Sequence, residues 1–332
     1  MTMEVLGMSL LLVLLFVGFG LIIGILFGFF GMGGSFLVTP ALLVLGYPAK
    51  VAVGSGLAFV FGTAVIGALR HRDLGQVDYK LAALIITGMT VGIEIGKRAV
   101  LLLERAGLSD IVISVAYVGL LVVVGLQTLR DSMQSESDDG DTLDLSNALE
   151  RVRIPPMLTF TGGTTVSLWV TLGIGLGIGI LSGFLGVGGG FLLMPTMLYG
   201  FGVPAEVAIG TSVLQITIPG SFGAFVYAQE GAVNVPVVAS LLLGSALGAR
   251  IGAAATELID GDDIKGYFAA MLLAGSVAVA SKKLSAMTGI AALKTVSMVL
   301  IFGAAILVSG AIIYSSVRVL RGQSVSGRPS TN

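Results

Sequence analysis

A glycine-rich octapeptide occurs twice in this chain, each time between two apolar runs. The later copy, residues 183–190, reads GFLGVGGG, and the earlier copy, residues 28–35, reads GFFGMGGS. The likeness continues downstream, where PAKVAVGS at 48–55 matches PAEVAIGT at 204–211. The repeat length of about 155 residues far exceeds the roughly 20 to 50 residues of a solenoid unit. The sequence therefore predicts two copies of one half-molecule.

Composition indicates the kind of half-molecule. Hydrophobic residues make up 55% of the chain and charged residues 11%, with a mean hydropathy of +1.01, whereas soluble domains carry about 25% charged residues. Such a chain belongs in a lipid bilayer, and its net charge of -1 points to no nucleic-acid partner. Cysteine is absent, which removes disulfides, thiolate metal sites and cysteine nucleophiles.

Apolar segments of two lengths follow one another along the chain. Two segments of about a dozen residues directly follow the glycine motifs, at 36–46 and 190–201, and have the length of half-helices or re-entrant pieces. Runs near the roughly 20 residues that a membrane-spanning helix needs occur at 5–29, 50–70, 79–103, 110–130, 166–186, 205–227, 235–257, 264–282 and 292–318. The predicted fold is an all-α polytopic membrane protein with two homologous repeats of about five helical segments each, glycine-broken or short helices, and one extra C-terminal span.

The domain boundaries follow from this pattern. We expect an N-terminal membrane repeat and a C-terminal one, separated by a linker in which acidic residues alternate with serines. An extra transmembrane helix and a polar tail complete the chain. The predicted ranges are 1–130 for the first repeat, 131–165 for the acidic hydrophilic linker, 166–286 for the second repeat, 287–320 for the extra helix and 321–332 for the tail.

Loop charges favour an inverted relation between the repeats. The loop from Arg70 to Lys80 is basic, whereas the matching loop from Tyr227 to Asn234 carries Glu230 and no Lys or Arg. The positive-inside rule places two such loops on opposite sides of a membrane. Three lysines at 282, 283 and 294 oppose this orientation. Inverted repeats require an odd number of crossings in each repeat, so the short segments would count as crossings.

The glycine motifs have two interpretations. A glycine-rich break inside the membrane frees backbone N–H groups that lipid cannot satisfy, and a helix that begins just after the break offers unpaired N–H donors and partial positive charge to an anion. The alternative is that the glycines only allow close helix packing. Duplication of the motif favours the first interpretation. The candidate binding residues are Gly31, Gly33, Gly34 and Ser35 in the first copy, and Gly186, Gly188, Gly189 and Gly190 in the second.

Neutral donors follow one turn into the spans after the short segments. Ser55 lies there in the first repeat, and Thr211 with Ser212 in the second, while Gln215 lies one turn beyond Thr211 on the same helix face. Hydroxyl and amide donors suit a weakly basic oxyanion, so these four residues join the candidate site. Ser and Thr in membrane helices also bond their own backbone or a neighbouring helix, which is the structural alternative.

Two ionisable residues occupy matching positions inside the spans. Glu94 and Arg250 each lie between glycines four residues apart, and an intramembrane ionisable group is a functional candidate by default. Arg250 offers a planar fork that suits a sulfonate or carboxylate, and Glu94 is the candidate for a coupling proton. Alternatively, the two form one ion pair that holds the repeats together. Lys97 and Arg98 are expected to mark the end of a span, with their charges near the headgroups.

The doubled glycine motif, each copy followed by an apolar segment with Pro and then by Ala-Val-Gly-Ser or Ala-Ile-Gly-Thr, resembles the sulfite exporter TauE/SafE family of membrane permeases over residues 10 to about 285. The resemblance implies a multi-pass secondary transporter in the plasma membrane of a prokaryote. It also implies a small sulfur-containing anion, such as sulfite or sulfoacetate, as the substrate, bound between the repeats at the glycine breaks. The expected partners are this anion and the lipid bilayer, and a homodimer is a further expectation.

The sequence argues against other classes of function. An enzyme is not expected, because no predicted span holds Cys, His or a clear Asp pair. No cofactor is expected, and no metal site, since the spans lack sets of carboxylates and imidazoles. Transport of another small organic anion is the alternative within the transporter class. A membrane assembly factor without a substrate is the alternative outside it.

Overall fold

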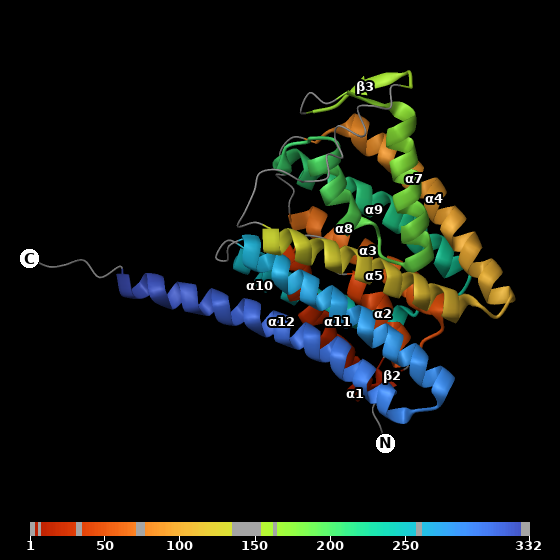
Figure 1. Cartoon of the computed structure of the whole chain (residues 1–332), viewed down its shortest axis with the longest axis vertical. Coiled ribbons are helices and arrows are strands. Elements are labelled where there is room, and N and C mark those ends of the chain that lie inside the picture. Colours follow the sequence, from red (N-terminus) through yellow and green to blue (C-terminus); the bar gives the residue numbers. More distant parts are fainter. Residues whose placement is uncertain are drawn as a thin grey trace, which may run out of the picture. The chain divides into compact units, whose positions relative to one another are not determined.

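The computed structural model of the protein describes residues 4–5, 8–30, 35–70, 77–134, 154–161, 165–256 and 261–326 (Figure 1). Within these residues, eight helices are long and apolar enough to cross a membrane. They are α1 (Leu10–Phe30), α3 (Ala49–Arg70), α4 (Tyr79–Arg105), α5 (Ser109–Gln134), α7 (Leu168–Leu185), α10 (Val235–Thr256), α11 (Gly261–Thr288) and α12 (Ala291–Ser326). The predicted all-α polytopic membrane fold is confirmed.

Further helical segments follow the two glycine motifs. The helix α2 (Ser35–Leu45) comes after the first motif, and α8 (Gly190–Pro195) continues into a π-helix, η1 (Thr196–Gly200), after the second. Both lie where the sequence predicts segments too short to cross upright. The helix α9 (Ala205–Gln229) then follows α8 and η1.

Two short β-hairpins were not predicted. The strands β1 (Glu4–Val5) and β2 (Met8–Ser9) pair antiparallel, so α1 begins later than the predicted span. The strands β3 (Met157–Thr159) and β4 (Thr165–Ser167) pair antiparallel within and just after the predicted linker. Strands of two or three residues are too short for an alternating pattern to identify. At the other end, α12 continues to Ser326, so the polar tail predicted from residue 321 begins with a helical segment.

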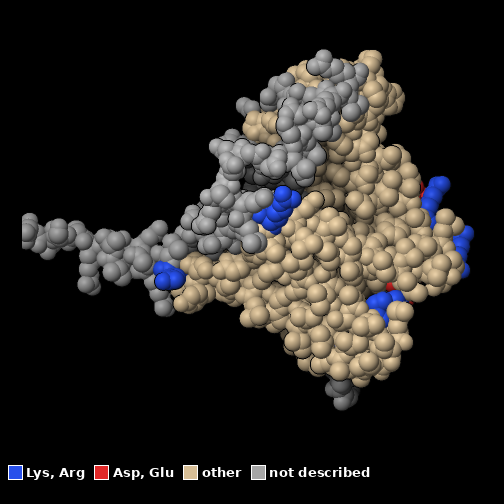
Figure 2. Space-filling view, viewed as in Figure 1, with Lys and Arg blue, Asp and Glu red and all other residues tan. Residues whose placement is uncertain are grey.

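The outer surface suits a lipid environment. Large apolar side chains such as Leu11, Val115 and Leu307 are exposed, which water disfavours and lipid tolerates. Figure 2 shows that Lys, Arg, Asp and Glu appear at only a few places among the described residues of the face in view. The described residues thus form a multi-pass membrane protein.

The chain divides into two compact units. Unit 1 contains Met1–Gly31, Tyr117–Ser137 and Ser240–Asn332, and unit 2 contains Met32–Ala116 and Asp138–Ala239. Each unit draws helices from both predicted repeats. The division of the chain into repeats at 1–130 and 166–286 therefore stays a prediction about sequence ancestry, distinct from these compact units.

Unit 1 is built on a close contact between α1 and α10. A Cβ atom added to any of six glycines would collide with backbone atoms of the opposite helix, so only glycine permits this approach. On α1 the six include Gly20, Gly24 and Gly28, and on α10 they include Gly244, Gly248 and Gly252. The helix α12 packs on α1 through the rings of Phe19 and Phe302, whose centroids are 4.7 Å apart.

Unit 2 contains a second contact of the same kind, between α4 and α7, which lie side by side in Figure 1. Glycines at 88, 92 and 96 of α4 meet the backbone of α7 at residues 172–176, 176–180 and 180–184 in turn. Because both series of numbers rise together, the two helices run parallel. The glycines of α7 at 175, 179 and 183 meet the backbone of α4 in return.

The helices α3 and α9, also in unit 2, occupy matching positions of the two predicted repeats and run in opposite directions. Gly223 of α9 faces Leu57 of α3. Three residues earlier on α9, Gly220 faces Phe61, which lies later on α3. Matching helices that run antiparallel are what an inverted-topology repeat requires. This geometry supports the inverted arrangement that the loop charges favour.

The α4–α7 contact generates a stability prediction with a matched control on the same helix. In Gly179→Ala the new methyl group would collide with the backbone of Met89, whereas in Gly177→Ala it would meet nothing within 4 Å. Both changes bring the same gain in helix propensity, so their difference isolates the collision. We expect Gly179→Ala to be less stable than Gly177→Ala by about 1–3 kcal/mol, measured by thermal unfolding in detergent. Equal stability of the two variants would contradict the close contact.

Topology can be tested through single cysteines, because the natural chain has none. Inverted repeats place positions 75 and 231 on opposite sides of the membrane. Cysteines introduced one at a time at these positions should therefore react with a membrane-impermeant maleimide from opposite faces of oriented vesicles. Labelling of both from the same face would exclude the inverted arrangement.

Candidate functional site

The helix α7 ends in a glycine turn at the motif predicted to break the helix. Gly186, Gly188 and Gly189 have φ angles of 76°, 67° and 77°, a left-handed conformation that side chains with a Cβ rarely adopt. Gly186 caps α7 by donating its N–H to the carbonyl of Ser182 at 2.7 Å. Gly189 precedes α8, and its carbonyl accepts the N–H of Leu193 at 3.0 Å. The turn therefore joins two helix ends through backbone hydrogen bonds.

Neighbouring residues pack closely against each of the three glycines of this turn. A Cβ atom at Gly186 would stand 2.6 Å from the carbonyl oxygen of Val53 on α3, and one at Gly189 would stand 2.7 Å from Ile178 of α7. Gly188 faces the side chain of Val60. These glycines are required both by their φ angles and by the lack of space. The packing interpretation thus holds for the second motif, and it leaves open a role for the motif's backbone N–H groups.

The structure describes less of the first glycine motif than of the second. Gly31, Gly33 and Gly34 lie outside the described residues, and the side chain of Ser35 does as well. The backbone of Ser35 begins α2. The expected anion contacts of the first copy therefore stay a prediction.

The hydroxyl groups of Ser55 and Thr211 make the same contact at matching positions. Ser55 Oγ accepts the N–H of Asn234 at 3.0 Å, and Thr211 Oγ1 accepts the N–H of Asp78 at 3.1 Å. In each case the donor N–H belongs to the residue directly before a helix: Asn234 precedes α10, and Asp78 precedes α4. Both hydroxyls are fully buried. Each still has its own O–H proton to donate, so a structural role and a binding role are compatible.

Asp78 is a buried carboxylate that ties several elements of unit 2 together. Its Oδ1 accepts the N–H of Leu81 at 2.9 Å and so caps α4, while its Oδ2 accepts the N–H of Thr161 at 2.7 Å. Its own N–H donates to Thr211, as above. Asp78 thereby links the start of α4 and the β3–β4 hairpin through its carboxylate, and α9 through its backbone N–H. Sequence analysis missed this residue, although an Asp three positions before the first packed apolar residue is an N-cap signal.

Gln215 has the most unusual environment of the predicted site residues. Its side chain is fully buried, and neither Nε2 nor Oε1 has a hydrogen-bond partner among the described residues. Most buried polar side-chain atoms in proteins are paired, and an unpaired one costs about 1–3 kcal/mol. Ser182 Oγ, in the last turns of α7, is buried and unpaired in the same sense. Ser212, next to Thr211, is buried as well.

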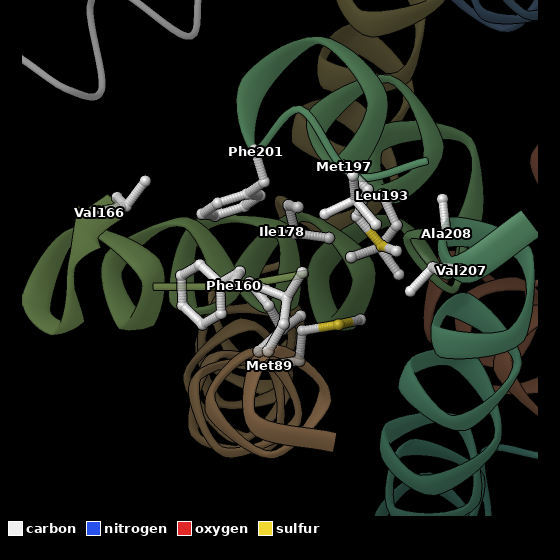
Figure 3. Packing of buried hydrophobic residues seen from close by; sticks show 12 residues of the cluster. Met89, Phe160, Val166, Ile178, Leu193, Met197, Phe201, Val207 and Ala208 are labelled. Carbon is white, nitrogen blue, oxygen red and sulfur yellow. The ribbon is translucent and has the colours of Figure 1, made fainter. Parts of the chain in front are cut away.

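The position of Gln215 follows from the periodicity of α9. Ala208, Thr211 and Gln215 are spaced three and four residues apart and share one face of the helix. Ala208 packs in an apolar cluster with Leu193 of α8 and Met197 of η1 (Figure 3). Because only residues 201–204 join η1 to α9 and α8 packs against α9, we expect the two segments to run antiparallel. Gln215, two turns beyond Ala208, is then expected to lie level with the start of α8.

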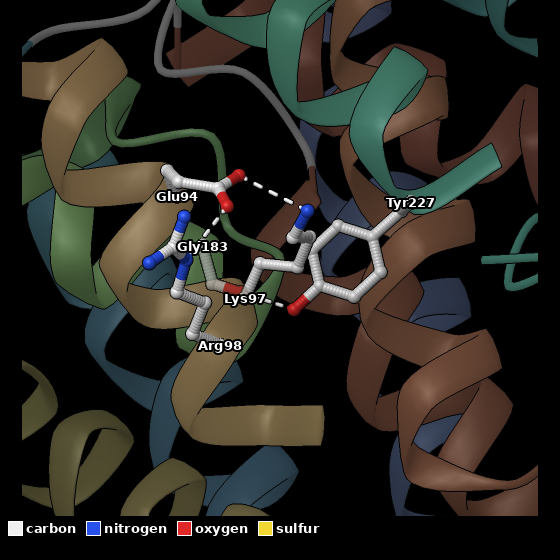
Figure 4. A network of polar contacts seen from close by, with 5 residues as sticks. All are labelled: Glu94, Lys97, Arg98, Gly183 and Tyr227. Atoms are coloured by element: carbon white, nitrogen blue, oxygen red, sulfur yellow. Dashed lines mark hydrogen bonds and ion pairs between the residues drawn. The ribbon is translucent and has the colours of Figure 1, made fainter. Parts of the chain in front are cut away.

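A charged network lies on α4 beside the end of α7 (Figure 4). The carboxylate of Glu94 contacts Lys97 Nζ at 3.0 Å and Arg98 Nε at 2.9 Å. Close by, the hydroxyl of Tyr227 donates to the carbonyl of Gly183 at 2.6 Å. Tyr227 thus satisfies a carbonyl in the last turn of α7, a position where helices leave carbonyls without partners. No spacing in the sequence indicated this contact.

Lys97 and Arg250 lie in different surroundings from each other. Lys97 was expected to reach headgroups at a span end, but it is buried and bonded to Glu94, so that expectation is wrong. A cation inside an apolar run can pair with a carboxylate one turn away instead of extending to the surface. The ion pairs that the structure gives Glu94 are with neighbours on its own helix. Arg250, in unit 1, is exposed, and its expected roles stay predictions.

The donors of this region suit an anion better than a cation or a metal. Among the described residues, no group of three His, Cys, Asp or Glu side chains is placed to hold a metal ion. What unit 2 offers instead is a neutral amide, hydroxyls, the N–H groups of a glycine turn and one buried ammonium group. Such groups bind oxygen atoms that carry negative charge.

Comparison with known proteins agrees with this chemistry. The model of the sulfite exporter TauE/SafE family matches residues 16–279. The chain belongs to this family. The match includes both glycine motifs, Glu94 and the whole of α3, α4, α7 and α9. No solved structure matches the chain significantly.

Relatives of this TauE/SafE protein are membrane transporters by name. A probable membrane transporter protein of Xylella fastidiosa is 27% identical over 242 residues, covering 71% of this chain and 82% of the relative. YjnA of Bacillus subtilis, also a probable membrane transporter protein, is 26% identical over 236 residues, covering 70% and 86%. MJ0441 of Methanocaldococcus jannaschii, with the same description, is 26% identical over 260 residues, covering 73% and 86%. This TauE/SafE protein is therefore a membrane transporter.

A stability prediction separates the structural role of Thr211 from that of a typical membrane threonine. Thr211→Val would leave the buried N–H of Asp78 without its acceptor, at a cost of about 1–3 kcal/mol. Thr217, one and a half turns along α9, bonds only the carbonyl of Val213 on its own helix in the described structure, so Thr217→Val is the matched control. We expect thermal unfolding in detergent to show a loss for Thr211→Val and little change for Thr217→Val. Similar unfolding temperatures for the two variants would show that the hydrogen bond from Asp78 to Thr211 does not contribute to stability.

Proposed function

We propose that this TauE/SafE protein is a secondary transporter of a small sulfur-containing oxyanion such as sulfite or sulfoacetate. The binding site includes the Gln215 amide and the glycine turn Gly186–Gly190 in unit 2. Thr211 and Ser212 on α9 and Ser55 on α3 contribute hydroxyl groups. The family description supports the substrate class, since it names a sulfite exporter.

The observation that carries the proposal is the unpaired, fully buried amide of Gln215. A neutral amide offers two N–H donors, which suit the oxygens of an oxyanion and require no charge in the bilayer. The amide lies level with the start of α8, where Gly190 and the next residue have no partner within the helix for their N–H groups. Donors from a side chain and from the backbone would thus meet at one place between α3 and α9, matching helices of the two predicted repeats.

Other parts of the proposal rest on the family and on the eight apolar helices. The protein works in the plasma membrane of a prokaryote, has no catalytic activity and needs no cofactor. A homodimer is part of the proposal as well. Glu94 is the coupling group, and Arg250, in unit 1, is a further candidate anion ligand on its sequence position alone.

Flux measurements in liposomes test the substrate. Purified protein would be reconstituted, and uptake of radiolabelled sulfite would be measured under an imposed pH gradient with sulfoacetate or acetate as competitor. We expect saturable sulfite uptake that sulfoacetate inhibits and acetate does not. Inhibition by acetate alone would favour another small organic anion. No saturable uptake would overturn the substrate proposal and favour a role in membrane assembly.

The role of Gln215 gives a prediction in which stability and activity change in opposite directions. In Gln215→Met the unpaired amide is replaced by an apolar side chain of similar size, so thermal stability should stay the same or rise. Hydrogen bonds to a charged ligand would be lost, so the sulfite concentration at half-maximal flux should rise about tenfold or more. Gln229→Met at the exposed end of α9 is the control and should change neither. Unaltered flux in Gln215→Met would remove Gln215 from the site.

A further inference from the structure

Lys97 is a buried cation in the described part of the bundle. Only 11% of its side chain is exposed, and it lies on α4 between Gly96 and Arg98. Of the charged residues described, only Lys97 and Asp78 are buried, and Asp78 is an anion engaged by backbone N–H groups. Burying an ammonium group is costly unless an anion neutralises it. Lys97 is therefore the one described cation that holds a fixed positive charge inside unit 2.

The glycine contact places this cation beside the break in α7. Gly96, the residue before Lys97, meets the backbone at Gly183 and Phe184, and Ile93, the residue before Glu94, meets Gly183 from the other side. Lys97 and Glu94 thus flank the last turn of α7. A helix C-terminus carries partial negative charge and favours a nearby cation. The ammonium group bonds Glu94 beside this last turn of α7.

Glu94 neutralises Lys97 in the described state. One carboxylate oxygen contacts Lys97 and the other contacts Arg98, whose side chain is 72% exposed. Among the helices packed against α4, α7 carries no ionisable residue, and α9 contributes Tyr227, whose hydroxyl is engaged with Gly183. On α3 the described cation is Lys50, paired with Glu104 at 2.9 Å. Lys97, Arg98 and Tyr227 are therefore the titratable or charged groups that face Glu94 from the described residues.

We infer that the transported anion competes with Glu94 for the ammonium group of Lys97, and that protonation of Glu94 allows the anion to take the place of the carboxylate beside Lys97. This inference rests on the proposed anion-transport function. In the resting state the carboxylate and the ammonium group neutralise each other. When Glu94 takes up one proton, its charge disappears and Lys97 is left with one uncompensated positive charge. One negative charge of the anion then replaces the carboxylate, so one proton and one anionic charge enter the site together and its net charge does not change.

The exposure of the two side chains suits this exchange. Glu94 has 28% of its side chain exposed, so a proton can reach the carboxylate without unfolding. A purely structural role accounts less well for the pair, because an ion pair between neighbours on one helix contributes only about 0.2–0.5 kcal/mol. Arg98 would satisfy Glu94 in that role without a buried lysine. The buried lysine is explained when its charge has a second partner.

The test compares sulfite uptake by four variants with uptake by the wild type at pH 6, 7 and 8. Each rate is divided by the wild-type rate at the same pH, so that titration of sulfite itself cancels. Lys97→Met removes the binding charge, and its relative rate should fall at least tenfold at every pH. Lys97→Arg keeps the charge and should recover most of the flux, which separates loss of charge from loss of folding. In Glu94→Gln the competing charge is gone, so its relative rate should rise as the pH increases from 6 to 8.

Arg105→Gln is the control, because Arg105 is an exposed cation in the last turn of the same helix, away from Glu94. Its relative rate should stay within about twofold of the wild type and should not depend on pH. Glu94→Gln should also lose the ability to accumulate sulfite in response to an imposed pH gradient, whereas Arg105→Gln should keep it. These readouts would not change if Glu94 and Lys97 only stabilised α4.

The possible failures are distinguishable. If the wild type shows no saturable sulfite uptake, the proposed function fails, and this inference falls with it. If the wild type transports sulfite but Lys97→Met does so equally well, Lys97 does not bind the anion. If Glu94→Gln keeps the pH dependence and the gradient-driven accumulation of the wild type, the carboxylate is not the competing group. Either of the last two results overturns the inference while the proposed function stands.

Discussion

The contact between the backbones of α4 and α7 is the constraint on which the polar features of unit 2 depend. Glycines on both helices remove every Cβ that would keep the helices apart, and the backbones meet over three successive turns. This contact brings α4 to the last turn of α7, which places Glu94 and Lys97 at the glycine turn. It also lets Tyr227 of α9 reach the carbonyl of Gly183. Without the close approach, the end of α7 would present unpaired carbonyls to lipid, which a bilayer does not tolerate.

The matching halves of the chain share their frame and differ in their polar groups. Ser55 and Thr211 are related by the same offset as Asp78 and Asn234, and each hydroxyl accepts the corresponding N–H. By contrast, the position that matches Gln215 holds Phe59, which is fully buried. The shared helix packing needs only small residues and helix caps, and a duplication copies these into both halves. An anion needs its donors in one place, so a site built on such a frame is expected to be unequal between the halves.

The helical segments could be predicted because long apolar runs, glycine breaks and prolines are local signals. The ends of α3, α4 and α9 lie within a few residues of the predicted ones for this reason. The β3–β4 hairpin could not be predicted, since three-residue strands carry no periodic signal. The burial of Lys97 was also missed, because its neighbour in space at Gly183 is distant in sequence, and only the α4–α7 contact brings the two together. Gln215 could be selected from its spacing to Thr211, but its lack of a partner depends on every helix around α9.

Two polar features of unit 2 lower the stability of the bundle, and they flank the same turn. The unpaired amide of Gln215 lies level with the start of α8, just after the turn, and the buried ammonium group of Lys97 lies beside the end of α7, just before it. An apolar residue at either position would avoid the cost of desolvation. In the proposed mechanism each cost has its own compensation: oxygens of the anion would accept the N–H groups of the Gln215 amide at one place, and the charge of the anion would replace that of Glu94 beside Lys97 at the other. The proposed exchange, in which Glu94 returns to Lys97 when the anion leaves, would let the bundle load and release a charged substrate without leaving a net charge in the membrane.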